Sequence, residues 1–199
     1  MILYNKYYIE GGKIMKKEII EWIKAIGTAL LLGFIITSFV GGTRVHGSSM
    51  NPTLVEDDFL ITFNSKKSID RGDIIIAKTD LEITPADLEG LDPISKWKIG
   101  KTKKVIKRVI ATEGDSLIIK DGKVFLNGEE LRENYINGNK TFGDLIIEKI
   151  PKGKIFIMGD NRGNSLDSRD GRIGLVDEED VLGKAVFRLY PFSKFGSLK

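Results

Sequence analysis

The stretch SLIIKDGKVFLNGEEL, residues 116–131, decides the fold class. Two short runs rich in Ile, Leu and Val flank Asp121-Gly122, and an Asp-Gly pair between apolar runs is the strongest short-range signal for a β-hairpin. Asn127-Gly128 supplies a second turn. The stretch therefore predicts three consecutive antiparallel strands, over 116–120, 123–126 and 130–131.

Similar short apolar runs lie on both sides of this hairpin. They are rich in β-branched residues and are separated by turn signals such as Asp70-Arg71-Gly72. Many short strands with glycine-rich turns indicate a mostly β fold, an antiparallel barrel or sandwich. Two segments differ from this pattern: 79–100 predicts an insertion with a helical turn at Thr84–Leu88, and 134–149 predicts a loop with an outer strand. The further strands expected are 59–63, 73–77, 105–111, 154–158 and 181–190.

The N-terminal part of the chain has a different pattern. No charged residue occurs from Ala25 to Thr43, and this length just suffices for a bilayer-spanning helix, which takes about 20 residues. A cleaved signal peptide fits less well, because its apolar core covers only about 7–15 residues and no clear cleavage site follows. A buried core helix is the other alternative. We expect one transmembrane helix over 25–43.

The distribution of basic residues predicts the orientation of this helix. Lysines are frequent before the apolar run, whereas Arg44 is the only Lys or Arg over residues 44–63. The positive-inside rule then predicts a cytoplasmic segment over 1–24 and an extracytoplasmic domain over 44–199. Met1 and Met15 both fit as the start of the chain. The lysines before the run are Lys6, Lys13, Lys16, Lys17 and Lys24.

Composition excludes several classes of function. The chain has no cysteine and a single histidine, which excludes a disulfide scaffold, a Cys-ligated zinc site, an iron–sulfur cluster and a thiol nucleophile. The formal charge is only +3, and no Lys/Arg block suggests a phosphate-binding stripe. We expect no metal, no organic cofactor and no nucleic-acid partner.

Three polar clusters carry candidate chemistry: HGSSMNPTL at 46–54, KVIKRVI at 104–110 and MGDNRGNSLDSRDG at 158–171. In the second, a lysine between valines is desolvated, which lowers its pKa and suits it to act as a base. Strand alternation does not decide whether Lys107 or Arg108 points inward. The third is not a calcium loop, because arginines stand where ligand oxygens are required. Singly, each cluster also fits a connector, an edge strand or a solvated turn.

Taken together, the clusters supply a serine nucleophile, an amine base and a polar loop that could orient both. They resemble the motifs of bacterial type I signal peptidases, especially the Gram-positive kind. Four motifs fit in order: Ser49–Leu54, Arg71–Ile75, Lys107–Asp115 and Gly159–Arg169. The resemblance implies a mostly antiparallel, barrel-like fold and a membrane-anchored serine endopeptidase. Such an enzyme removes signal peptides from exported preproteins by cutting after small residues, in an Ala-x-Ala pattern.

The resemblance also implies a role for individual residues. Ser49 is the expected nucleophile, with its backbone N–H as an oxyanion donor, and Lys107 is the expected general base. Gly47 stands where some members carry a serine as second oxyanion donor, so the sequence does not identify that donor. His46 lies on the nucleophile loop and not at the position of the base. The remaining roles are a lysine-orienting Ser165, a structural ion pair of Asp167 and Arg169, and a pocket-lining Met50.

Two alternatives stay open at this point. One is a specialised Ser-Lys processing protease that acts on pilins or conjugation factors. The other is a non-catalytic membrane-anchored β domain that binds exported chains, although the presence of both Ser49 and Lys107 argues against it. The expected partners are exported preproteins and the lipid bilayer.

Overall fold

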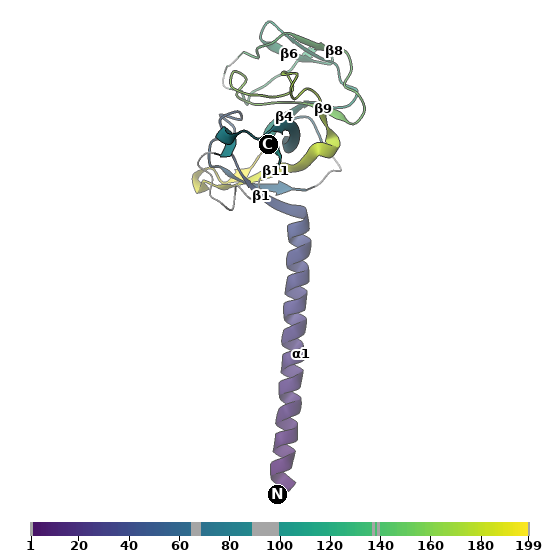
Figure 1. The fold of residues 1–199 in the computed structure, drawn as a ribbon, viewed down its shortest axis with the longest axis vertical. Coiled ribbons are helices and arrows are strands. Elements are labelled where there is room, and N and C mark those ends of the chain that lie inside the picture. Colours follow the sequence, from purple (N-terminus) through teal and green to yellow (C-terminus); the bar gives the residue numbers. More distant parts are fainter. Residues whose placement is uncertain (1, 65–68, 89–99, 137, 139, 199) are drawn as a thin grey trace. The chain divides into compact units, whose positions relative to one another are not determined.

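The structure is a computed structural model that describes residues 2–64, 69–88, 100–136, 138 and 140–198. It divides into two units, one ending at Val40 and the other covering Gly41–Lys199. The first unit is a single helix and the second holds nearly all of the strands (Figure 1).

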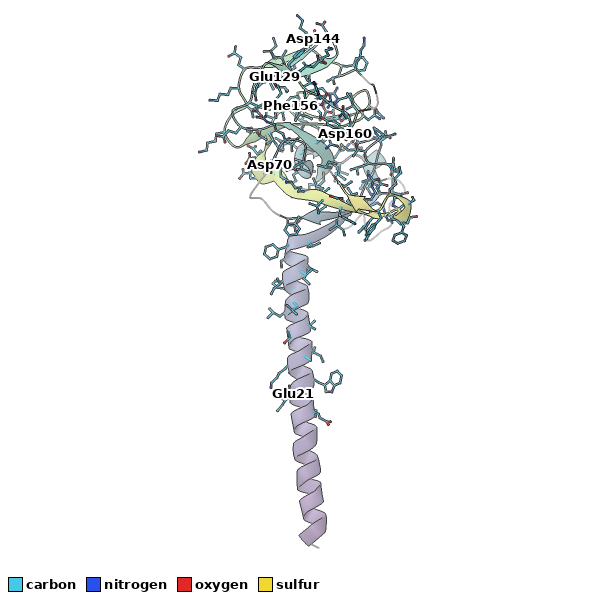
Figure 2. All side chains as sticks on the ribbon, turned by 180° about the vertical axis from the view of Figure 1, so that it is seen from behind. Glu21, Asp70, Glu129, Asp144, Phe156 and Asp160 are labelled. Carbon is cyan, nitrogen blue, oxygen red and sulfur yellow. The ribbon has the colours of Figure 1, made fainter. Side chains whose placement is uncertain are left out.

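Helix α1 runs from Ile2 to Phe39. Its segment Glu18–Phe39 has a mean hydropathy of 1.9, and in the described part of the chain it alone is long and apolar enough to cross a membrane. Large apolar side chains such as Trp22 and Phe34 are exposed around it, and Figure 2 shows side chains projecting from this segment. The predicted apolar helix is therefore present.

The predicted end of this helix at Thr43 is wrong. The helix ends at Phe39, and Val40–Arg44 forms strand β1. Two glycines explain the change, because a Cβ on Gly41 would lie 2.7 Å from Thr62 Oγ1 and a Cβ on Gly42 would lie 2.7 Å from Phe59 Cζ. Glycine disfavours helix, and here it allows the backbone of β1 to lie close against β2.

The described strands form two antiparallel sheets. In the larger sheet the order is β1-β2-β11-β3-β4-β9-β10, with β12 paired to β11, and in the smaller sheet it is β7-β6-β5-β8. The larger sheet comprises β2 (Phe59–Phe63), β3 (Ile74–Glu82), β4 (Thr102–Ala111), β9 (Lys154–Met158), β10 (Val176–Asp177), β11 (Val181–Tyr190) and β12 (Gly196–Ser197) besides β1. The smaller sheet comprises β5 (Leu117–Lys120), β6 (Lys123–Leu126), β7 (Glu129–Glu130) and β8 (Leu145–Ile147).

This architecture confirms the mostly β, antiparallel prediction, although the described pairings leave the larger sheet open at β1 and β10. The predicted hairpin is β5–β6, with Leu117 opposite Leu126, and β8 is the predicted outer strand. The described part of the second unit also contains three short 3-10 helices: η1 (Pro85–Leu88), η2 (Glu178–Asp180) and η3 (Phe192–Lys194). The first confirms the predicted helical turn, while 89–99 of the predicted insertion lie outside the described residues.

The larger sheet is packed on both faces. Along β3, Ile74 and Ile76 belong to one hydrophobic cluster, whereas Ile75 and Ala77 belong to another. Strand β4 is antiparallel to β3 and continues the same pattern, because Ile106 packs on the first cluster and Val109 lies in the second. Successive side chains of a strand point to opposite faces, so five consecutive residues of β4, Lys107–Ala111, are all buried.

Candidate active site

Ser49 and Lys107 meet in the folded chain. Ser49 lies in the loop between β1 and β2, and Lys107 lies in β4. Lys107 Nζ donates hydrogen bonds to Ser49 Oγ at 2.7 Å and to the carbonyl oxygen of Ile106 at 3.0 Å. The two predicted residues thus stand at the distance at which a base takes a proton from a hydroxyl.

The surroundings of Lys107 favour its neutral form. The residue is only 4% exposed, and burial lowers the pKa of its amine from 10.5 to about 8. The negative charges of Asp167 and Asp160 oppose this shift, while the charge of Arg169 adds to it. Among the described residues no carboxylate forms a salt bridge with Lys107. A buried amine without such a partner is available as a base near neutral pH.

The loop that carries Ser49 is fixed at both ends. At its neck the backbone N–H of Val45 donates to Asp58 O at 2.8 Å, and that of Asp57 donates to Val45 O at 3.0 Å. Further along, Arg188 of β11 contacts Asp58 at 3.1 Å and donates to the carbonyl oxygen of Thr53. The position of Ser49 is therefore restrained by bonds within the loop and by one distant strand, β11.

Met50 is buried in this structure, and its pocket-lining role stays a prediction. Its side chain is 1% exposed and lies in a hydrophobic cluster with Leu54, Leu60 and Ile74. A side chain so enclosed offers no surface to a bound peptide in this structure, and it serves to anchor the nucleophile loop to the core. We therefore do not include Met50 among the substrate contacts proposed below.

The loop after β9 contains the predicted ion pair. Arg169 donates to Asp167 through Nε at 2.8 Å and through Nη2 at 2.9 Å, and the N–H of Gly159 donates to Asp167 Oδ2 at 2.9 Å. Burial raises the pKa of Asp167, but the hydrogen bonds and positive charge of Arg169 outweigh it and hold that pKa below its usual value. The carboxylate stays charged and fixes the loop.

Ser165 lies beside the nucleophile, although its hydrogen bonding differs from the expectation. A Cβ added to Gly159 would overlap both Ser165 Oγ and the carbonyl oxygen of Ser49, so the three residues are in close contact. Ser165 Oγ is buried and is near enough to the Asp167 carboxylate to help lower its pKa, but it has no hydrogen bond of normal geometry within the described residues. Its orienting role toward Lys107 stays a prediction.

Sequence reasoning missed a second buried cation and its partner. Arg108, next to Lys107, donates to Asp160 through Nε at 2.9 Å and through Nη2 at 2.7 Å. Asp160 follows β9, the strand that holds Phe156 (Figure 2). The guanidinium also lies 4.0 Å from the ring centroid of Tyr135. In the sequence, Arg108 and Asp160 belong to two separate motifs, and no pattern indicates that they pair.

Arg162 is a further buried residue of this loop. It is one of the largest fully buried side chains, and it donates to Glu133 and to Thr141 Oγ1, the latter at 2.6 Å. Its Nε donates to the carbonyl oxygen of Gly159 at 3.2 Å. The loop after β9 is thus fixed to the segment before β8, which the sequence left as an ambiguous loop.

Within the described ranges, no group of three or more His, Asp or Glu side chains is placed to hold a metal ion. The arrangement supplies instead a hydroxyl, an amine of lowered pKa and backbone donors, which are the parts of a serine hydrolase that uses lysine in place of histidine.

Comparison with known proteins decides the family. The family model described as signal peptidase, peptidase S26, matches residues 19–190. The chain belongs to this family of serine peptidases. It is 36% identical to signal peptidase I P of Bacillus subtilis subsp. natto, over 94% of this chain and 98% of the relative. It is 35% identical to signal peptidase I T of Bacillus subtilis strain 168, over 90% of each chain.

The chain is also similar to a Staphylococcus enzyme and to one solved structure. Signal peptidase IB of Staphylococcus aureus strain COL is 32% identical over 91% of this chain and 94% of its own length. A crystal structure of a signal peptidase I from Enterococcus faecalis V583 covers 60% of this chain with a TM-score of 0.42 and 25% identity. Membership of the S26 family supports signal-peptide cleavage as the reaction, and with the apolar α1 it indicates a membrane-anchored peptidase.

Proposed function

We propose that this S26 peptidase removes N-terminal signal peptides from exported preproteins with a Ser49–Lys107 dyad, cutting after small residues in an Ala-x-Ala pattern. The observation that carries the proposal is the 2.7 Å hydrogen bond from Lys107 Nζ to Ser49 Oγ. The lowered pKa of Lys107, about 8, supports it. The Ala-x-Ala pattern rests on the family resemblance.

The proposed mechanism begins with neutral Lys107. Its amine takes the proton of Ser49 as Oγ attacks the scissile carbonyl, and the resulting ammonium gives that proton to the leaving amine. After the leaving group departs, the neutral amine activates a water that hydrolyses the acyl-enzyme. The Ser49 N–H stabilises the oxyanion; among the described residues it donates to no other group. In this proposal Ser165 orients the amine, while Asp167 and Arg169 hold the loop.

The titration of Lys107 gives this mechanism a pH dependence. With a pKa of about 8, the neutral fraction of the amine rises about tenfold per pH unit below that value and levels off above it. We expect kcat/KM for a preprotein to follow the same curve. A flat profile between pH 6 and 9 would contradict a titrating lysine base.

The proposed topology puts residues 1–24 in the cytoplasm, the apolar part of α1 in the bilayer, and the catalytic unit outside. The concentration of lysines before the apolar run supports it. An anchor of this kind keeps the site in the thin layer where cleavage sites emerge, which raises the effective concentration of enzyme and substrate. Protease protection of the catalytic unit in sealed inside-out vesicles tests it, and digestion of that unit by the added protease would contradict it.

The first experiment uses the full chain in detergent and a preprotein with an Ala-x-Ala site. We expect one cut after the final Ala, located by mass spectrometry, and no cut with Ser49→Ala or Lys107→Ala. Both variants should keep the circular dichroism spectrum of the unaltered protein. Absence of cleavage by folded, unaltered protein would instead favour a specialised processing protease or a binding domain. Normal cleavage by either variant would remove that residue from the mechanism.

A further inference from the structure

The nucleophile is held from outside its own loop by one asparagine. Asn161 Nδ2 donates to the carbonyl oxygen of Ser48 at 3.1 Å, and the backbone N–H of Asn161 donates to the carbonyl oxygen of Ser49 at 3.0 Å. The two carbonyls on either side of the Ser49 Cα therefore both bind the same residue. Asn161 belongs to the loop after β9, 113 positions away from Ser48.

The bond to Ser48 O sets the direction of the donor that the reaction needs. A trans peptide is planar, so its C=O and N–H point in opposite directions. The carbonyl of Ser48 is held by Asn161 Nδ2 and by the N–H of Asn51, each at 3.1 Å. The N–H of Ser49, in the same peptide plane, must then point away from both of these donors. Among the described residues no acceptor takes it.

The orientation of the Ser48–Ser49 peptide matters more in this chain than in an enzyme that has a side-chain hydroxyl as second oxyanion donor. Gly47 has no side chain to offer a hydroxyl two residues before Ser49, and its own N–H donates to Glu56 Oε2 at 2.5 Å. Removing one oxyanion donor from a hydrolase costs about 100- to 1,000-fold in kcat. If the Ser48–Ser49 peptide could rotate, the Ser49 N–H would stabilise the oxyanion less.

From these contacts we infer that Asn161 is a positioning residue, which fixes the Ser48–Ser49 peptide so that the Ser49 N–H faces the developing oxyanion. This inference rests on the proposed function, because it assigns a purpose to the Ser49 N–H in that reaction. Asn161 touches neither Lys107 nor the hydroxyl of Ser49 in the described contacts. Its effect is therefore on the stabilisation of the transition state and not on the protonation of the base.

The test compares Asn161→Ala with Asn164→Ala in the full chain. Asn164 lies on the same loop, but its Nδ2 binds only the side-chain hydroxyl of Ser48, at 2.9 Å, and no peptide group of the nucleophile. We expect Asn161→Ala to lower kcat about 10- to 100-fold with KM and the pH midpoint of kcat/KM unchanged. Asn164→Ala should keep the kcat of the unaltered protein.

A second readout reports the oxyanion directly. A peptide aldehyde ending in Ala forms a reversible tetrahedral adduct with a serine nucleophile, and its oxygen takes the oxyanion position. Its inhibition constant should rise in Asn161→Ala by the same factor as kcat/KM falls, because transition-state mimics follow transition-state binding. If Asn161 has only a structural role, Asn161→Ala should have a lower thermal midpoint and fewer active molecules. Its inhibition constant should then not rise in proportion to the fall in kcat/KM.

Several outcomes overturn the inference. They are an unchanged kcat in Asn161→Ala, an equal loss in Asn164→Ala, or a shifted pH midpoint. Should Asn161→Ala fail to fold, Asn161→Asp keeps the shape and the backbone bond but has no Nδ2 donor, so full activity there is equally decisive. If the unaltered protein does not cleave the preprotein, the proposed function fails and the inference with it, whereas cleavage with a fully active Asn161→Ala overturns the inference alone.

Discussion

Lys107 and Arg108 follow each other on β4, and both are almost completely buried, yet their surroundings differ. Arg108 has a bidentate carboxylate in Asp160 and the ring of Tyr135. Lys107 has a hydroxyl and one carbonyl oxygen. One buried cation is neutralised by a partner of opposite charge, and the other is driven toward its uncharged form by burial. The first arrangement suits a structural role, and the second suits the role of base proposed for Lys107.

Exchanging the type of cation at position 107 gives the largest expected effect. In Lys107→Arg the guanidinium stays protonated at any working pH, so the site keeps a cation but loses its base. We expect kcat to fall by at least about 10⁴-fold, the order seen when one member of a catalytic triad is lost. Arg108→Lys, measured beside it, should retain most of the activity. Comparable losses in both variants would mean that the two cations are not functionally distinct.

Removing the partnered cation tests its role in stability. Arg108→Met leaves the carboxylate of Asp160 buried without its counter-ion, and breaking a buried pair in this way costs about 3–5 kcal/mol of unfolding free energy. Chemical denaturation of the catalytic unit in the full chain measures it. Arg71→Met is the matched control, because the Arg71–Asp115 pair has one half-exposed partner and should cost less. An equal cost would argue that burial of the pair is not what matters.

The sequence predicted those parts of the fold that are determined locally. Strand β2 and the β5–β6 hairpin have apolar runs bounded by their own turn residues, and they appear where expected. Strands β10 and β12 have two residues each and exist only through their partners, so no local pattern marks them. Strand β3 continues to Glu82 through polar residues because β4 pairs with it there.

The site was predictable to the extent that it follows motifs. Ser49 and Lys107 were identified by resemblance, and the structure brings them together. Alternation could not decide between Lys107 and Arg108, because the larger sheet is packed on both faces and buries both. The burial of Met50 was not predictable, because a motif gives the order of residues but not the direction of a side chain. Asn161 was quoted within a motif, but nothing in the sequence showed that it contacts Ser48.

Removing the unpartnered cation should have the opposite effect on stability. The pKa of Lys107 is about 8 in the folded chain and 10.5 as a free side chain, so the folded state binds fewer protons between these values and stability rises as pH increases through that window. Below pH 8 the full penalty applies, about 3 kcal/mol at 1.36 kcal/mol per pKa unit. Lys107→Met should therefore unfold at higher denaturant concentration at pH 7.

The pH dependence provides the control for this prediction. The gain in Lys107→Met should shrink between pH 8 and 10.5, where the lysine has lost its proton in the folded state but keeps it in the unfolded state. A destabilised Lys107→Met at pH 7 would show that the bonds to Ser49 and Ile106 outweigh the desolvation of the amine.

The smallest expected effect concerns the space beside Ser49 and Ser165. A methyl group on Gly159 would lie 2.6 Å from Ser165 Cβ and would overlap the carbonyl oxygen of Ser49. In Gly159→Ala these groups must shift, and displacing a reacting group by about 1 Å costs on the order of 100-fold in rate. Single-turnover cleavage measures it, with Gly163→Ala as control because its nearest neighbour is Phe142 at 3.8 Å. Normal turnover in Gly159→Ala would show that the loop moves aside without cost.

The separation of the dyad along the chain has a consequence for the newly made protein. Ser49 and Lys107 are 58 positions apart, and the residue that clamps the nucleophile lies 113 positions beyond Ser48. Until β4 and β9 have paired, the amine is solvated and protonated and the hydroxyl is that of an ordinary serine. Under the proposed mechanism, the chain therefore has no active dyad during its own synthesis, and completion of the larger sheet is the step that assembles one.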